Sequence, residues 1–119
     1  MDDWRVLFHR DFVSEFRELP GEAKVALGVV FDLLREFGPR LGRPQVDTLK
    51  NSRHGNMKEI RVQANDDWYR LAFAFDPRKQ AVVLCGGTKG GVNSDRFYRS
   101  LIATADKRYG DWLEEHNNE

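Results

Sequence analysis

The sequence lacks the cysteine pairs of disulfide-bonded proteins, the long apolar runs of membrane-spanning proteins and the signal segment of secreted proteins. Cys85 is the only cysteine among 119 residues, so no disulfide can form within the chain, and the surrounding apolar run AVVLC indicates a buried strand thiol. No stretch approaches the roughly 20 apolar residues that cross a bilayer. The first residues also lack the basic and apolar segments of a secretory signal. We therefore expect a cytoplasmic protein.

The chain also has no net charge and no metal-ligand motif. The 19 basic residues are balanced by 19 acidic ones, which argues against a strongly basic nucleic-acid-binding protein. The three histidines are scattered and show no metal-ligand spacing, so we expect no metal and no cofactor. The charge is uneven, however: residues 40–61 hold six basic residues against two acidic ones, or +4. A local basic patch on a neutral protein can still hold a few phosphates.

The N-terminal third of the chain is predicted to form a strand and a helical hairpin. Alternating apolar residues predict a strand over residues 3–9. A short helical pattern opens at Asp11 and ends at Pro20-Gly21. A longer helix is predicted over Glu22 to Phe37, and Gly38-Pro39 supplies its C-terminal stop.

The remainder is predicted to be a long loop, three strands and a final helix. Residues 39–56 are rich in proline, glycine and charge, which indicates an exposed loop. Strands are expected at residues 58–63, 68–75 and 81–85, and the glycine-rich residues 86–91 should end the third strand. The last helix is expected to begin near Ser94, a favourable N-cap residue.

These elements predict one α+β domain spanning residues 1–119, with the order β-α-α-β-β-β-α. Three consecutive strands with short connections favour a small antiparallel sheet. The helical hairpin would cover the apolar face of this sheet, and the helix after it would complete the domain. We expect the opposite face to stay open.

Two arginines are predicted to lie on that open face. Ile60 and Val62 share one side of their strand, so Arg61 lies on the other. In the next strand Arg70 alternates with the core-facing residues and is followed by small alanines. If the two strands pair as a hairpin across Asn65-Asp66-Asp67, both arginines project from the same face. The sequence therefore predicts an anion site.

The chain resembles the RelE/HigB superfamily of toxins from bacterial type II toxin-antitoxin modules, particularly its phage-derived HigB-like branch. The resemblance covers nearly the whole chain and is most specific in three runs: LGRPQVDTLKNSRHGNMKEIRVQ, WYRLAFAFDPRKQAVVLCGGTKG and RFYRSLIATAD. It implies a compact sheet packed on a helical hairpin. It also implies cleavage of messenger RNA, often on the ribosome, by an endoribonuclease that needs no metal.

The resemblance also implies site residues. The family's basic strand residue matches Arg61, the arginine of its YRL element matches Arg70, and its basic residue after the third strand matches Lys89. Some relatives use a tyrosine near the C-terminus, for which Tyr98 is the nearest candidate. Where several relatives have a further basic residue two positions before the strand arginine, this chain has Glu59.

Metal-free RNA cleavage needs a group that takes the 2′-hydroxyl proton, charge stabilisation at phosphorus, and a proton for the leaving 5′ oxygen. Guanidinium groups suit the second task, which we assign to Arg61 and Arg70. His54 or Lys89 would handle protons, since each can titrate near neutral pH in a suitable environment. The remaining candidates would bind RNA: the basic residues Lys50, Arg53 and Lys58 along its backbone, and the aromatic residue Trp68 by stacking on a base.

Several of these residues also have interpretations that involve no function. Arg61 could pair with Glu59, His54 could be an ordinary solvated histidine, and Trp68 could simply pack. The Gly86 to Gly91 segment lacks the spacing of a phosphate-binding loop, so a flexible turn is its default interpretation.

Two other functions are compatible with the same sequence pattern. One is a non-catalytic, ParE-like inhibitor of DNA gyrase, although such chains often lack a basic set like Arg61, Arg70 and Lys89. The other is an inactive remnant that only binds its antitoxin and tunes transcription. For the toxin interpretations the resemblance implies an antitoxin partner, usually a helix-turn-helix DNA-binding protein, and operator DNA would be bound only through that complex.

Overall fold

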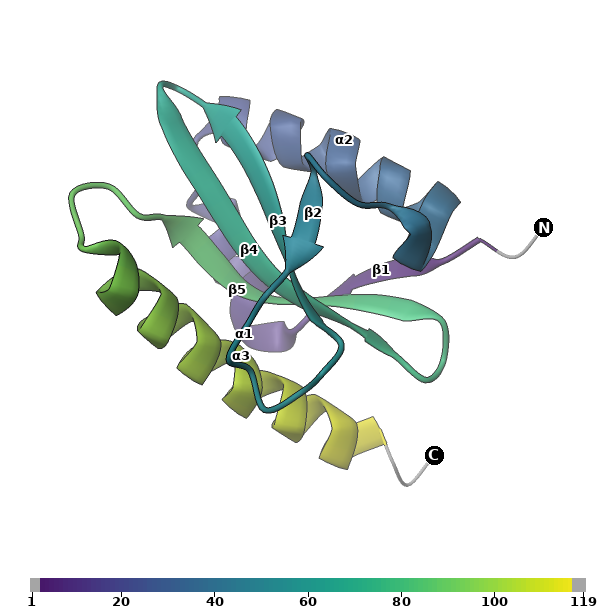
Figure 1. Ribbon diagram of the computed structural model, residues 1–119. Helices are drawn as coiled ribbons and strands as arrows, with labels where there is room; N and C mark the ends of the chain where they lie inside the picture. Colours follow the sequence, from purple (N-terminus) through teal and green to yellow (C-terminus); the bar gives the residue numbers. More distant parts are fainter. Residues whose placement is uncertain (1–2, 117–119) are drawn as a thin grey trace.

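The computed structural model describes residues 3–116, which form a five-stranded sheet with helices on both sides (Figure 1). The elements follow in chain order: β1 (Arg5–Phe8), α1 (Arg10–Arg17), α2 (Gly21–Phe37), the 3₁₀ turn η1 (Gly38–Arg40), β2 (Val46–Thr48), β3 (Met57–Ala64), β4 (Asp67–Asp76), β5 (Gln80–Thr88) and α3 (Ser94–His116). The strand order is β1-β5-β4-β3-β2. The predicted α+β class is confirmed.

The sheet differs from the prediction at both of its edges. The stretch predicted as a loop contains β2, which pairs antiparallel with β3 and buries Val46. Three residues with one buried side chain are too short to produce a periodic signal. At the other edge β1 runs parallel to β5, so the sheet is mixed rather than purely antiparallel.

The first core lies between the sheet and the helical hairpin. Large side chains of β3 and β4, among them Ile60, Leu71 and Phe73, pack against Phe12 of α1 and Leu27 of α2. The α1 helix begins after His9, whose imidazole nitrogen accepts a hydrogen bond from the Asp11 amide. The predicted helical hairpin and its apolar side are confirmed.

The opposite face of the sheet is not open, contrary to the prediction. Helix α3 crosses it, as Figure 1 shows, and forms a second core with buried strand residues, both small and large. Its Leu101, Ala105 and Tyr109 are buried there, and Ala72 and Ala74 leave the space that the helix needs. The cap of α3 is Asn93 rather than Ser94, because the Asn93 side chain accepts from the amides of the first turn.

Two local features set the register around the arginines. The β3–β4 turn is Asn65-Asp66, and both residues have positive φ (53° and 62°), as a two-residue type I′ hairpin requires. Strand β5 continues through Gly86 and Gly87 to Thr88, whereas the glycines were expected to end it. Gly86 belongs in this strand because a Cβ there would overlap the carbonyl oxygen of Arg70.

Candidate functional site

Arg61 and Arg70 are directly opposite each other in the β3–β4 pairing. Both therefore lie on the α3 side of the sheet, so the predicted common face is confirmed. Like charges placed directly opposite across two strands destabilise a sheet. We call these two residues the arginine pair.

Aromatic rings surround the arginine pair. The Arg61 guanidinium carbon lies 5.7 Å from the ring centre of Trp68, and that of Arg70 lies 5.8 Å from Tyr98 and 6.0 Å from Phe97. Cation–π contacts of this kind contribute about 0.5–2 kcal/mol each. The Nε atoms of both arginines are buried and have no hydrogen-bond partner within residues 3–116. Buried donors of this kind are uncommon and are often found at functional sites.

Glu59 is the acidic member of the cluster. It is only 7% exposed and lies two residues before Arg61, hence on the same face of β3. The Tyr98 hydroxyl donates to its Oε1 at 2.9 Å. Burial raises the pKa of the Glu59 carboxyl, although the Tyr98 hydrogen bond, Arg61 and Arg70 act in the opposite direction. Burial and the Glu59 contact also raise the pKa of Tyr98.

Sequence reasoning treated Glu59 as a departure from the family pattern and as a surface ion-pair partner for Arg61. The structure makes it the buried carboxyl beside both arginines, and strand alternation alone could have placed it on their face. Asp47 is its register partner on β2. The Thr48 amide and the nearby Arg43 and Arg61 lower the pKa of Asp47, so the acidic and basic groups of this region are interleaved.

Lys89, Trp68 and Tyr98 lie at the same end of the sheet as the arginine pair. Lys89 is two residues beyond Gly87, the register partner of Arg70, and its ammonium group donates to the Val92 carbonyl at 3.0 Å. Trp68 is 44% exposed, so part of its ring is open to a ligand while it contacts Arg61. The hydrogen bond from the Tyr98 hydroxyl to Glu59 fixes the position of the tyrosine ring.

His54 is not brought to the arginine pair. Its loop is docked on α3, where the Ser52 hydroxyl and the Arg53 amide both donate to the Asp106 carboxylate. The His54 ring packs edge-on against Tyr109, with ring centres 4.8 Å apart. Asp106 lies eight residues beyond Tyr98 on the same helix, which corresponds to about 12 Å along its axis. Most residues of this loop are exposed, as predicted, and contacts with α3 hold it in place.

Lys58 and Lys50 are also separated from the centre of the site. Lys58 shares a face of β3 with Ile60 and Val62, opposite to Arg61, and its ammonium group donates to the Thr48 hydroxyl at 3.3 Å. It cannot supply a second cation beside Arg61. Lys50 is exposed in the turn after β2.

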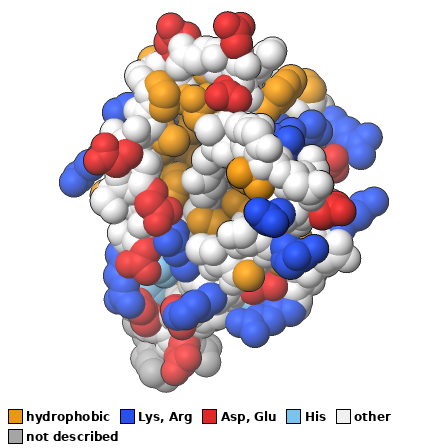
Figure 2. Space-filling view, turned by 90° about the vertical axis from the view of Figure 1, so that its left-hand side faces the viewer, with side chains coloured by type: hydrophobic (Ala, Val, Ile, Leu, Met, Phe, Trp, Pro, Cys, Tyr) orange, Lys and Arg blue, Asp and Glu red, His pale blue; other side chains and the backbone are white. Residues whose placement is uncertain are grey.

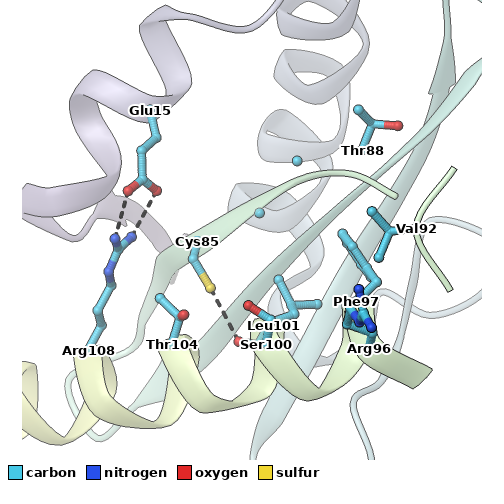
Figure 3. Close-up of a pocket in the computed structure, with 12 residues that line it drawn as sticks. Glu15, Cys85, Thr88, Val92, Arg96, Phe97, Ser100, Leu101, Thr104 and Arg108 are labelled. Carbon is cyan, nitrogen blue, oxygen red and sulfur yellow. Dashed lines mark hydrogen bonds and ion pairs between the residues drawn. The ribbon is translucent and has the colours of Figure 1, made fainter. Parts of the chain in front are cut away.

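A cavity of about 470 Å³ lies between α1 and α3 beside the end of β5 (Figure 3). The Glu15 carboxylate and the Arg108 guanidinium form a two-point ion pair across it, with distances of 2.7 and 2.9 Å. Cys85 lines the cavity, but its thiol donates to the Leu101 carbonyl, and burial raises its pKa to about 12. It is therefore a packing residue and not a nucleophile, as the sequence predicted.

The charges on the surface are mixed. On the face drawn in Figure 2, basic and acidic side chains alternate around a group of hydrophobic ones. Within residues 3–116, no group of three or more histidine, cysteine or acidic residues could hold a metal ion. No helix in this range is long and apolar enough to span a membrane.

Comparisons with known proteins identify relatives of this chain. A family described as "Phage derived protein Gp49-like" matches residues 14–110. The protein named toxin HigB3 of Mycobacterium tuberculosis is 43% identical over 98 residues, which is 82% of this chain and 83% of that protein. The protein named toxin HigB2 of the same organism is 42% identical over 69% of this chain, but the match spans only 41% of HigB2.

Two solved structures share the fold. A double mutant of the E. coli toxin RelE in the free state has a TM-score of 0.64 at 18% identity, covering 89% of this chain and 97% of that one. A chain of the archaeal RelE-RelB complex from Pyrococcus horikoshii has a TM-score of 0.54 at 22% identity, covering 77% of this chain and 100% of that one.

Proposed function

Because this chain belongs to the Gp49-like family of RelE/HigB-type toxins, we propose that it acts as an endoribonuclease that cuts messenger RNA at the arginine pair. The observation that carries the proposal is the direct pairing of Arg61 and Arg70, with both Nε donors buried and without a protein partner in residues 3–116. Two fixed guanidinium groups on rigid strands form a site for a phosphate group.

In the proposed reaction the 2′ oxygen of the RNA bonds to the adjacent phosphorus and the bond from phosphorus to the 5′ oxygen breaks. The arginine pair stabilises the charge that gathers on the phosphate oxygens. Glu59 takes the 2′-hydroxyl proton, since it is the buried carboxyl beside both arginines and its pKa is raised. This assignment replaces His54, which is docked near Tyr109.

Lys89 is the proposed source of positive charge, and of a proton, near the leaving 5′ oxygen. It lies next to the strand end that pairs with Arg70. Trp68 is proposed to contact a neighbouring nucleotide, because part of its ring is exposed beside Arg61. The exposed Lys50 is proposed to contact the RNA backbone farther from the arginine pair. The neutral net charge supports a ribosome-bound substrate, since no wide positive field would hold free RNA.

The proposed partner is an antitoxin, as the RelE-RelB complex of the archaeal relative suggests. We propose that it is a helix-turn-helix protein and that operator DNA is bound only by the complex. Co-purification with the product of an adjacent helix-turn-helix gene is the expected result. Failure of the two proteins to associate would remove this partner.

Induced expression tests the cleavage proposal. The chain should arrest growth and produce new mRNA 5′ ends on ribosomes, and the Arg61→Ala, Arg70→Ala double variant should do neither. A matched control is Arg5→Ala, Arg17→Ala, which removes two exposed arginines elsewhere and should leave cleavage intact. Growth arrest without cleavage would favour gyrase inhibition, and absence of arrest would favour an inert antitoxin-binding remnant.

A further inference from the structure

A second cavity, of about 380 Å³, lies between the turn after β2 and the first turns of α3. Tyr98 lines this cavity and also contacts Arg70 of the arginine pair, so the cavity and the candidate site share a wall. We call it the Tyr98 pocket. Its other lining residues are Asn51, Asp95, Arg99, Ile102 and Ala103.

The Tyr98 pocket combines an apolar wall with two opposite charges. Tyr98 and Ile102 supply the apolar surface, and Asp95 and Arg99 supply the charges. Asp95 and Arg99 are four residues apart on one helix face, a spacing at which acid and base commonly pair. Within residues 3–116, neither side chain has an ion-pair or hydrogen-bond partner. Both are therefore available to a third group.

A carboxylate and a guanidinium together match guanine better than the other bases, because guanine can make two hydrogen bonds to each group. Guanine presents the N1–H and N2–H₂ donors to a carboxylate, and the O6 and N7 acceptors to an arginine. Adenine carries a donor where guanine has O6, and the pyrimidines lack N7. A phosphate is a poorer ligand here, because Asp95 would repel it. Stacking on the Tyr98 ring would add affinity for a base.

We propose that the Tyr98 pocket binds a guanine base of the RNA whose phosphate lies at the arginine pair. The proposal rests on the proposed RNA cleavage and extends it to sequence preference. Asp95 and Arg99 read the base, Tyr98 stacks on it, and the Asn51 amide lies within the pocket for a further hydrogen bond.

Asp95 also has an ordinary structural role, which the test must distinguish from base recognition. It lies in the first turn of α3, where a negative charge interacts favourably with the helix dipole. That role accounts for an acid at this position, but it does not account for the unpaired Arg99 or the aromatic wall. A change at Asp95 should therefore be judged by base preference, with thermal stability recorded in parallel.

Binding can be measured on the folded chain with the four ribonucleoside 5′-monophosphates. In NMR titrations, GMP should shift the amide signals of Asn51, Asp95 and Arg99 and bind roughly tenfold more tightly than AMP, CMP or UMP. Because all four probes carry the same phosphate, contacts at the arginine pair cancel from the comparison. Asp95→Asn should abolish the preference. Equal affinities for the four nucleotides, or no shift at these three residues, would overturn the proposal.

Asp111→Asn is the matched control on the same helix. Asp111 pairs with Lys107 at 3.1 Å and does not line the Tyr98 pocket. This variant should keep the GMP preference of the unchanged chain. Loss of the preference in Asp111→Asn as well would assign the effect to helix charge rather than to the pocket.

Cleavage maps separate this inference from the proposed function. Guanine should be enriched at a fixed position relative to the cut, and the enrichment should vanish in Asp95→Asn while cuts continue elsewhere. Cleavage without guanine enrichment would overturn the guanine pocket and leave the endoribonuclease proposal standing. Selective GMP binding in a chain that cuts no RNA would support the pocket and overturn the endoribonuclease.

Discussion

The face of the sheet under α1 and α2 is filled mainly with large apolar side chains, whereas the face under α3 is apolar only in part. On the first face Phe73 and Leu71 are fully buried. On the second, Ala72 and Ala74 accept the C-terminal part of α3, while Arg70 and Glu59 lie under its first turns, beside Tyr98 and Phe97.

The contrast shows how one sheet keeps the residues that stabilise the fold on one face and the candidate site residues on the other. Strand alternation is the same on both faces, so neighbouring residues of β3 and β4 serve either the core or the site. The second core holds the site residues on rigid backbone without enclosing them in apolar contacts. Changes on the first face should therefore cost stability, and changes at the charged end of the second face should cost activity.

The largest expected effect comes from Glu59→Gln on the second face. The amide keeps the size of the side chain and can still accept from Tyr98, but it cannot take a proton. Cleavage should fall by about 10²–10⁴-fold, the usual contribution of a general base. Single-turnover cleavage of ribosome-bound mRNA measures this loss, and Asp47→Asn, at the opposing register position on β2, is the matched control.

The same variant gives a stability result of known sign. Since the folded pKa of Glu59 is raised, the folded state binds more protons than the unfolded state above pH 4.5, and stability falls as pH rises through the folded pKa. Glu59→Gln removes this loss and should be slightly more stable than the unchanged chain at neutral pH. Unchanged cleavage by a stable Glu59→Gln protein would exclude Glu59 as the proton acceptor.

On the first face, Phe73→Ala should cost about 3–5 kcal/mol of the free energy of unfolding, because a fully buried ring leaves a cavity. Urea denaturation measures the loss. Trp68→Ala is the contrasting variant: its ring is 44% exposed, so its stability cost should be much smaller. A larger cost at Trp68 than at Phe73 would contradict the assignment of the main core to the first face.

Sequence periodicity accounted for every described strand except β2, for the helical hairpin and for the shared face of the arginine pair. These features depend on strand alternation and helical spacing, which can be read directly from the sequence. The position of α3 was not accessible in the same way, because Leu101 and Ala105 show an apolar stripe without showing which surface it covers. The same limit applies to His54, whose loop is fixed by contacts with residues more than 50 positions away.

The close approach of the β5 backbone to β4 beside Arg70 can be tested at Gly86. A Cβ at this position would overlap the Arg70 carbonyl oxygen and the Leu71 Cα, so Gly86→Ala should separate β5 from β4 and cost roughly 1–3 kcal/mol. Cleavage should fall as well, since Arg70 would move. At Gly87 a Cβ meets nothing within 4 Å, and Gly87→Ala should change stability little. Equal stability of the two variants in urea would refute the close-approach argument.

The smallest expected effect lies at the edge of the first core, where His9 caps α1. His9 is 2% exposed, and its Nδ1 accepts from the Asp11 amide at 3.1 Å, which requires that nitrogen to be unprotonated. Burial is the main reason that the pKa of His9 is lowered from 6.5; Arg108 and Arg10 add to this, whereas Asp11 and Glu115 oppose it.

Because the unfolded state then binds more protons than the folded state below pH 6.5, stability should decrease as pH falls from 6.5 through the folded pKa. His9→Asn replaces the Nδ1 acceptor with a side-chain oxygen suited to the N-cap and removes the titration. Thermal unfolding at several pH values below 6.5 should therefore show a smaller decrease in Tm for His9→Asn than for the unchanged chain. Parallel Tm curves would mean that protonation of His9 does not oppose folding, and that the cap tolerates a charge at the edge of the first core.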